Sequence, residues 1–171
     1  MKRGFTLLEV IIAISILTVA IGGIYALIQQ TLRAASLANS KLIAAHLSQE
    51  GVEIVRNFRD NNWLNQRFST STSWRAGLGA GDYEVDYDDT VPTSFVGEGR
   101  YLYIGGTNGF YTYLNSPGPT DIQTKFKRKI TITDAEVGDD EIEVAVKVFW
   151  QERGGEYEVE VVENLYNWYG Y

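Results

Sequence analysis

The sequence predicts an α+β fold in which a long N-terminal helix packs against an antiparallel β-sheet. Two periodicities support this prediction. Apolar residues recur every three or four positions as far as Phe58, whereas side-chain character alternates with a period of two from Asp82 onward. Hydrophobic residues are also concentrated before this change of period. The sequence therefore divides into a helical part, which ends at residue 59, and a globular sheet domain over residues 60–171.

The first half of the predicted helix is apolar enough to span a membrane. No charged residue occurs from Val10 to Leu32, and a membrane-spanning helix needs about 20 apolar residues. Lys2 and Arg3 precede this run, and the positive-inside rule places such residues in the cytoplasm. One acid, Glu9, lies inside the edge of the run. An ionisable side chain is costly in hydrocarbon, so Glu9 indicates a function.

Three interpretations of this N-terminal segment compete. A secretory signal peptide has a shorter apolar core and a small-residue cleavage site, but here the run continues past Gly22-Gly23 without a polar exit. A plain signal anchor explains the apolar run and its cationic flank, but it explains neither Gly4 nor Glu9. The third interpretation is a signal that is cut at Gly4, and the residues around that glycine favour it.

Residues 4–9, Gly-Phe-Thr-Leu-Leu-Glu, resemble the class III signal of type IV prepilins and pseudopilins. The resemblance implies that a prepilin peptidase cuts after Gly4, which ends a leader of residues 1–4, and that Phe5 becomes the N-methylated first residue of a helix over 5–59. Glycine suits a peptidase pocket that must approach the backbone closely. In this family the acid at the fifth mature position, here Glu9, neutralises the terminal amine of a neighbouring subunit. The physics agrees, because an ammonium partner offsets the cost of burying a carboxylate.

The resemblance implies a structural subunit of a type IV pilus-like filament, a minor pilin or pseudopilin, and no enzyme. The implied partners are other pilin subunits, the prepilin peptidase, an inner-membrane assembly platform, and membrane lipid before assembly. The implied location is the cytoplasmic membrane, crossed once with the N-terminus inside and the body outside, followed by an extracellular or periplasmic filament. Two alternatives stay open: a pseudopilin of a type II secretion system, and a membrane-anchored module that binds a surface or DNA. A signal-anchored enzyme is disfavoured, because His46 is the only histidine and no catalytic constellation is present.

An amphipathic pattern extends the predicted helix beyond the apolar run. Leu47, Gly51, Ile54 and Phe58 follow one another at spacings of four, three and four residues. No proline interrupts the segment, so we expect one continuous helix. Gly22-Gly23 is the expected place for a bend or local unwinding, and Asp60-Asn61-Asn62 is the expected end of the helix.

Six strands are predicted in the sheet domain. They are Asp82–Tyr87, Tyr101–Ile104, Phe110–Leu114, Thr124–Thr133, Glu141–Trp150 and Glu156–Glu163. The last two strands form the clearest hairpin. With Gly154-Gly155 as a two-residue loop, Trp150 pairs with Val159 and Val148 pairs with Val161, all on one face.

An acidic group in the sheet domain suggests a metal site. Asp86, Asp88 and Asp89 are weak candidates for calcium, because Ca²⁺ binds clustered carboxylates. Their spacing is not that of an EF-hand loop, and a turn beside Pro92 explains them as well. No other metal or cofactor is expected. The chain has no cysteine, so disulfides and thiol chemistry are excluded.

A basic group forms the second candidate site of the body. Lys125, Lys127, Arg128 and Lys129 are predicted to lie on a solvated strand face, and contact with DNA or another negatively charged surface is the alternative. The chain has 15 basic and 22 acidic side chains, for a net charge of −7. Such an acidic balance argues against strong nucleic-acid binding by the body alone.

Overall fold

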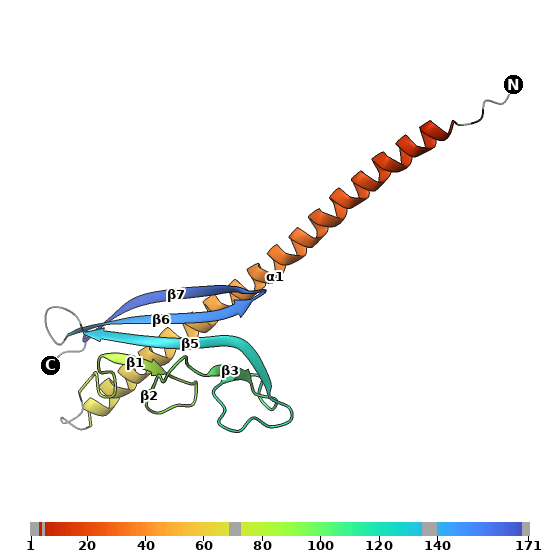
Figure 1. The fold of residues 1–171 in the computed structure, drawn as a ribbon. Helices are drawn as coiled ribbons and strands as arrows, with labels where there is room; N and C mark the ends of the chain where they lie inside the picture. Colours follow the sequence, from red (N-terminus) through yellow and green to blue (C-terminus); the bar gives the residue numbers. More distant parts are fainter. Residues whose placement is uncertain (1–3, 5, 69–72, 135–139, 169–171) are drawn as a thin grey trace. The chain divides into compact units, whose positions relative to one another are not determined.

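The chain folds as one long helix followed by an antiparallel sheet, which confirms the predicted α+β class (Figure 1). This computed structural model describes residues 4, 6–68, 73–134 and 140–168. The helix α1 spans Leu7–Gln66. The strands are β1 (Gly81–Glu84), β2 (Thr93–Ser94), β3 (Tyr101–Ile104), β4 (Tyr111–Thr112), β5 (Ile122–Asp134), β6 (Glu141–Glu152) and β7 (Gly155–Tyr166).

The chain forms two compact units, Met1–Ser40 and Lys41–Tyr171. The first contains the N-terminal part of α1, and the second contains the rest of α1 and the whole sheet. The second unit is therefore the body of the protein.

The strand β5 organises the sheet of the body. On one side β5 pairs with β6, which in turn pairs with β7. On its other side β5 pairs with β1 through its C-terminal half and with β3 through its N-terminal half. The short strands β2 and β4 extend β1 and β3, and every pairing is antiparallel. The three long strands β5, β6 and β7 thus form the main surface of the sheet (Figure 1).

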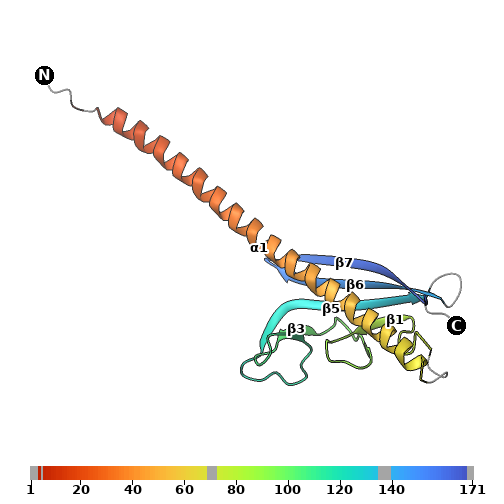
Figure 2. The same cartoon turned by 180° about the vertical axis from the view of Figure 1, so that it is seen from behind.

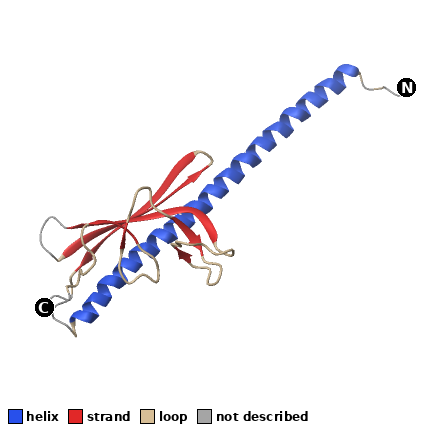
Figure 3. Ribbon diagram, turned by 60° about the horizontal axis from the view of Figure 1, so that its bottom comes forward, coloured by secondary structure: helices blue, strands red, loops and turns tan. Residues whose placement is uncertain are grey.

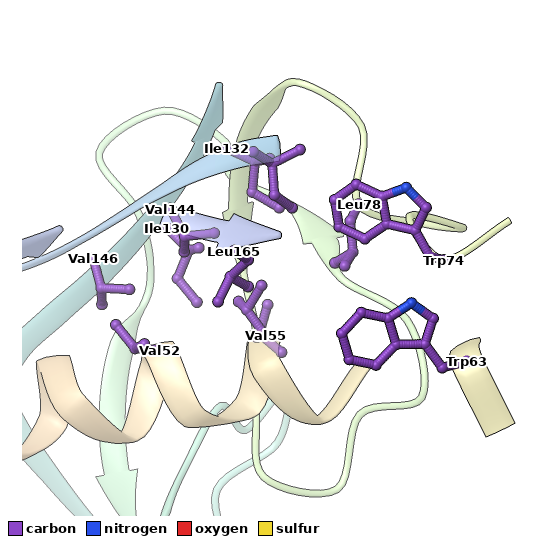
Figure 4. Packing of buried hydrophobic residues seen from close by; sticks show 12 residues of the cluster. Val52, Val55, Trp63, Trp74, Leu78, Ile130, Ile132, Val144, Val146 and Leu165 are labelled. Carbon is purple, nitrogen blue, oxygen red and sulfur yellow. The ribbon is translucent and has the colours of Figure 1, made fainter. Parts of the chain in front are cut away.

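The C-terminal part of α1 covers one face of this surface, as the two opposite views agree (Figures 1 and 2). Every second residue of β6 from Ile142 to Trp150 is buried, which is the period expected of a strand with one covered face. Val52 and Val55 of the helix pack against these strand residues (Figure 4). The core contains Val52, Val55, Trp63, Trp74, Leu78, Val85, Ile130, Ile132, Ile142, Val144, Val146 and Leu165. Its burial supplies the main stabilisation of a body that has no disulfide.

A glycine allows the helix to approach the sheet closely. A Cβ atom on Gly51 would lie 2.8 Å from Cγ1 of Val146 and 3.2 Å from Cδ of Arg128. Both of these neighbours are fully buried, so neither has free space to move into. Gly51, which helical spacing predicted to lie on the apolar face, is therefore a position that favours a residue without a Cβ atom.

The predicted end of the helix at residues 60–62 is wrong, because α1 continues through them to Gln66. Contacts within the body stabilise this last part of the helix. The side-chain amide of Asn62 donates hydrogen bonds to the carbonyl oxygens of Trp74 and Ala76, at 3.0 and 2.8 Å. Trp63 is buried in the core next to it. These contacts outweigh the weak helix propensity of the asparagines. The predicted helix end depended on that propensity alone.

The predicted strands are present, with differences at their ends. β3 has the predicted bounds, whereas β1 ends at Glu84 rather than at Tyr87. It ends early because the side chain of Asp86 accepts a hydrogen bond from the backbone N–H of Tyr87, in place of a neighbouring strand. The two-residue strand β2 was not predicted, since so short a segment shows no alternation.

The hairpin of β6 and β7 is confirmed (Figure 3), but its predicted register is wrong. Trp150 pairs with Tyr157 instead of Val159, and Val148 pairs with Val159. The pairing is thus shifted by two residues. Because side chains alternate with a period of two, such a shift leaves each side chain on its predicted face.

The turn at the end of this hairpin explains the shift. The two loop residues are Arg153 and Gly154, with φ angles of 53° and 80°, and Gly155 is already the first residue of β7. Positive φ at both loop positions is the type I′ turn, whose twist matches that of the flanking strands. The structure therefore places an arginine, rather than a second glycine, in the left-handed conformation.

Candidate functional site at the N-terminus

The helix α1 begins with a side-chain cap. Oγ1 of Thr6 accepts a hydrogen bond from the backbone N–H of Glu9 at 3.3 Å, and the carbonyl oxygen of Thr6 accepts one from Val10 at 3.2 Å. A threonine in this N-cap position satisfies one of the free N–H groups of the first turn. This role of Thr6 was not predicted from the sequence. The Thr-x-x-Glu spacing of a capping box was the signal that could have found it.

The first unit exposes an unusually apolar surface. Between Leu7 and Leu32 the large hydrophobic side chains have exposed fractions from 45% at Val10 to 79% at Leu7. The most apolar 18-residue window of α1 has a mean hydropathy of 2.5, and none of it is buried. By length and composition this helix is able to cross a membrane. A soluble monomer rarely exposes such a continuous apolar surface, so the segment needs a lipid or protein environment.

The serine and threonine hydroxyl groups in this apolar segment are satisfied within the helix. Ser15 donates to the carbonyl oxygen of Ile11 at 2.8 Å, and Thr31 donates to that of Leu27 at 2.9 Å. Thr18 donates to the carbonyl oxygen of Ser15 at 2.9 Å. In hydrocarbon no water replaces a missing hydrogen bond, so these internal bonds suit a segment inside a membrane.

The helix is unbroken at Gly22 and Gly23, so the predicted local unwinding is wrong. A Cβ atom at either glycine would find no other atom within 4 Å. The physical reason is that glycine lowers helix propensity by only about 1 kcal/mol and, unlike proline, keeps the backbone N–H that the helix needs.

The predicted site residues lie at and just before this helix start. Gly4 is exposed, and nothing lies within 4 Å of the position that a Cβ would occupy there. Glu9 is exposed in the first turn of α1, and within the part of the chain that the structure describes no cation pairs with its carboxylate. An acid in the first turn is favoured by the helix dipole. Phe5 lies outside the described residues, as do Lys2 and Arg3.

A comparison with protein families identifies this segment. Residues 1–25 match the model described as the prokaryotic N-terminal methylation motif. The match supports a type IV pilin-like protein. Comparisons with curated proteins and with solved structures found no match. The motif, the apolar helix and the helix-on-sheet arrangement of the body together give a pilin-like architecture, and they indicate membrane anchoring and a structural role.

The acidic group in the body of this pilin-like chain has a structural role. Asp86 is buried, and its Oδ1 accepts a hydrogen bond from the backbone N–H of Tyr87 at 2.7 Å. Its Oδ2 accepts from the backbone N–H of Tyr113 at 2.8 Å and from the hydroxyl of Thr112. Oδ2 of Asp89 in turn accepts from the backbone N–H of Asp86 at 2.7 Å. These bonds connect the turn after β1 to β4.

The calcium prediction gains no support from this arrangement. Asp86, Asp88 and Asp89 border one groove of about 520 Å³, but both oxygens of Asp86 are used by the hydrogen bonds of the turn. Among the described residues no group of three His, Cys, Asp or Glu side chains is arranged to hold a metal ion. The calcium site therefore stays a prediction.

The basic group of the pilin-like chain is divided between the two faces of β5. Lys125, Lys127 and Lys129 border a groove on the face away from the helix. Arg128, predicted to share that solvated face, is instead fully buried against the helix. This prediction is wrong because neighbouring residues of a strand point to opposite faces. Three consecutive basic residues cannot all be solvated on a sheet that has one covered face.

The buried Arg128 connects three parts of the body. Its Nη1 donates to the carbonyl oxygen of Leu47 in α1 at 3.1 Å, and its Nη2 donates to that of Val85 at 2.6 Å. Nη1 also lies 3.3 Å from Oε1 of Glu50 in the helix. The carbonyl oxygen of Arg128 accepts a hydrogen bond from the hydroxyl of Tyr113 at 3.1 Å. Burial raises the pKa of Tyr113 to about 12, so this hydroxyl keeps its proton at neutral pH.

Proposed function

We propose that this chain is a structural subunit, a minor pilin or pseudopilin, of a type IV pilus-like filament. The match of residues 1–25 to the methylation motif supports this proposal most directly. The exposed apolar surface of the first unit adds support, because it needs either lipid or the apolar helices of other subunits around it. The subunit is held in the cytoplasmic membrane before assembly, with Lys2 and Arg3 inside and the body outside.

Maturation removes residues 1–4 and methylates the new N-terminus at Phe5. The open surroundings of Gly4 suit a protease that must approach the backbone. The cut also leaves the helix start intact, because the N-cap Thr6 and its partner Glu9 both lie after it. The mature chain therefore begins one residue before a capped helix.

In the filament, Glu9 pairs with the terminal ammonium of a neighbouring subunit. The carboxylate is exposed in the first turn and has no cationic partner among the described residues of its own chain. An unpaired charge is costly among apolar helices, so a partner from a second chain stabilises the assembled state. The driving force for assembly is then both apolar and electrostatic.

Mass spectrometry of the N-terminus tests the maturation step. The chain is expressed together with a prepilin peptidase, and the expected product begins with N-methylated Phe5. Gly4→Leu is the control that should block the cut. A chain that keeps Met1, or that is cut downstream of the apolar run, would overturn the proposal.

A second experiment tests the role of Glu9 in assembly. Glu9→Gln removes the charge but keeps a residue that is accepted at this position of a capping box, so the helix start is preserved. We expect normal cleavage and loss of incorporation into filaments, whereas Glu9→Asp should retain part of the incorporation. Equal incorporation of Glu9→Gln and the unchanged chain would refute the pairing.

A further inference from the structure

The face of the sheet away from the helix carries a regular pattern of charge. Lys129 of β5 pairs with Lys147 of β6, which pairs with Glu160 of β7. The next row has the same order of charge: Lys127 of β5 is followed by Phe149 of β6 and Glu158 of β7. Each row therefore runs from a cation on β5 to an anion on β7.

The pattern of charge continues by one more row, next to the turn between β6 and β7. Lys125 lies two residues before Lys127 on β5, and Glu156 lies two residues before Glu158 on β7. Residues two apart on a strand lie on the same face. The three lysines and the three glutamates thus form two parallel lines, with β6 between them.

The three lysines and two of the glutamates, Glu156 and Glu158, border one broad groove of about 940 Å³. The lysines contact aromatic rings there: Nζ of Lys127 lies 4.6 Å from the ring centre of Tyr101, and Nζ of Lys129 lies 5.8 Å from that of Phe95. Phe149 adds an apolar side chain in the middle of the groove. The groove therefore combines apolar contact area with both signs of charge, as protein interfaces do.

A polyanion does not fit this pattern. The groove is bordered by four lysines but also by three glutamates, Glu98, Glu156 and Glu158, so the excess is a single positive charge. All four lysines already have acids of their own chain within reach: Nζ lies 2.6 Å from Glu152 for Lys125, 3.7 Å from Glu98 for Lys127, 3.2 Å from Asp82 for Lys129 and 3.3 Å from Glu158 for Lys147. The chain as a whole carries −7. A nucleic acid or acidic polysaccharide would be repelled by the glutamate line as it approached the lysine line.

A second copy of the chain does fit this pattern of charge. If two such faces stack with a two-fold axis parallel to β6, the lysine line of each copy lies over the glutamate line of the other. The side chains of β6 then face their own counterparts, because the axis runs along that strand. A two-fold interface is self-complementary in this way, and stacked sheets lie about 10 Å apart, which long side chains such as lysine and glutamate can fill. The twist of the sheets confines the contact to the central rows.

We infer that this face is a contact surface for a second copy of the same chain, paired through the lysine line of β5 (Lys125, Lys127 and Lys129) and the glutamate line of β7 (Glu156, Glu158 and Glu160). This goes beyond the proposed function, which rests on the N-terminal segment. The face of the sheet away from the helix in one subunit would bind the same face of another. The contact therefore joins subunits without using the apolar part of α1.

Cross-linking tests the two-fold arrangement directly. The chain has no cysteine, so Phe149→Cys introduces a single thiol on the proposed axis. The full chain is placed at one copy per lipid nanodisc, which prevents association of apolar helices within a bilayer, and a short bismaleimide is added. We expect a cross-linked dimer with Phe149→Cys and little with the control Thr107→Cys, whose side chain lies on an exposed loop.

Charge reversal tests the pairing of the two lines. Reversing the lysine line (K125E/K127E/K129E) or the glutamate line (E156K/E158K/E160K) in the Phe149→Cys chain should each lower the dimer yield about tenfold or more. A mixture of the two reversed chains should restore the yield, because both lines of one chain are then anionic and both lines of the other are cationic. Misfolded chains would not regain association on mixing.

Three outcomes would overturn the inference. The first is no dimer from the Phe149→Cys chain, and the second is a yield that charge reversal does not change. The third is failure of the mixture to associate while the lysine line binds a single-stranded oligonucleotide, which would assign this face to a polyanion instead. None of these outcomes affects the N-terminal cut, so the proposed function is tested separately.

Discussion

The guanidinium of Arg128 lies 3.3 Å from the carboxylate of Glu50, and this pair connects the central strand of the sheet to the helix. The two partners differ in exposure, because Arg128 is fully buried whereas the side chain of Glu50 is 35% exposed. A buried cation costs several kcal/mol unless partners compensate it. Glu50 and two backbone carbonyl oxygens are partners of Nη1 and Nη2, whereas Nε of Arg128 has no hydrogen-bond partner among the described residues.

We expect Glu50→Gln to lower the free energy of unfolding by about 1–3 kcal/mol, because the buried guanidinium loses its only carboxylate partner among the described residues. Adding Arg128→Met should recover part of this loss, since the double variant has no buried charge left to compensate. The measurement is denaturant unfolding of the full chain in detergent, followed by tryptophan fluorescence.

Glu53→Gln is the matched control for this pair. Glu53 lies on the same helix, is 63% exposed and pairs with Arg56 at the surface, where an ion pair contributes less than about 1 kcal/mol. A double variant of Glu50 and Arg128 that is less stable than Glu50→Gln alone would show that the arginine stabilises the body without its acid.

Gly51→Ala tests the close approach of the helix to the sheet. Alanine favours a helix over glycine by about 1 kcal/mol, but its Cβ would lie 2.8 Å from the buried Cγ1 of Val146. We expect the steric clash with Val146 to outweigh the gain in helix propensity, so that the free energy of unfolding falls by about 1–2 kcal/mol. With Val146→Ala as background, which removes the clashing methyl group, Gly51→Ala should become neutral or stabilising. An equal loss in both backgrounds would contradict the contact.

The sequence predicted the parts of the fold that depend on periodicity. The alternation predicted the strand over Glu141–Trp150 and placed Val148 and Trp150 on one face, which is the buried one, and the helical spacing placed Gly51 on the apolar face of the helix. The errors arose where a single contact decides the outcome. The bonds of Asn62 extend the helix, and the turn at Arg153 sets the register of the hairpin.

In the candidate sites too, some features could be predicted from the sequence and others depended on the folded structure. The N-terminal residues were identified from a local motif, which the comparison with families supports, while the cap made by Thr6 was missed although its spacing is local too. Burial of Arg128 was not predicted, because the cluster was interpreted by composition instead of by alternation. The charge pattern across β5, β6 and β7 depends on strand register, so it became visible only once the pairing was known.

Arg153→Asn should stabilise the hairpin of β6 and β7. Arg153 has a φ angle of 53° in a type I′ turn. This left-handed conformation is unfavourable for arginine, and asparagine adopts it more readily. We expect a gain of about 0.5–1 kcal/mol in the free energy of unfolding. Arg153→Val is the opposite control, since a β-branched residue resists positive φ and should destabilise the body. Equal unfolding midpoints for the two variants would exclude a strained turn at this position.

Tyr113→Phe should change how stability depends on pH above pH 10. Burial raises the pKa of Tyr113 from 10.0 to about 12, so the folded state keeps this proton over a range in which the unfolded state loses it. The resulting stabilisation is fully present below pH 10 and is lost as the pH rises through 12, by roughly 3 kcal/mol in total. The phenylalanine variant should lose about 1 kcal/mol at neutral pH, with the hydrogen bond to Arg128, and then decline less steeply in base. Unfolding curves between pH 8 and about pH 12 measure both effects. Tyr166→Phe, which removes an exposed hydroxyl, is the control, and parallel declines for Tyr113→Phe and the unchanged chain would contradict the burial of this proton.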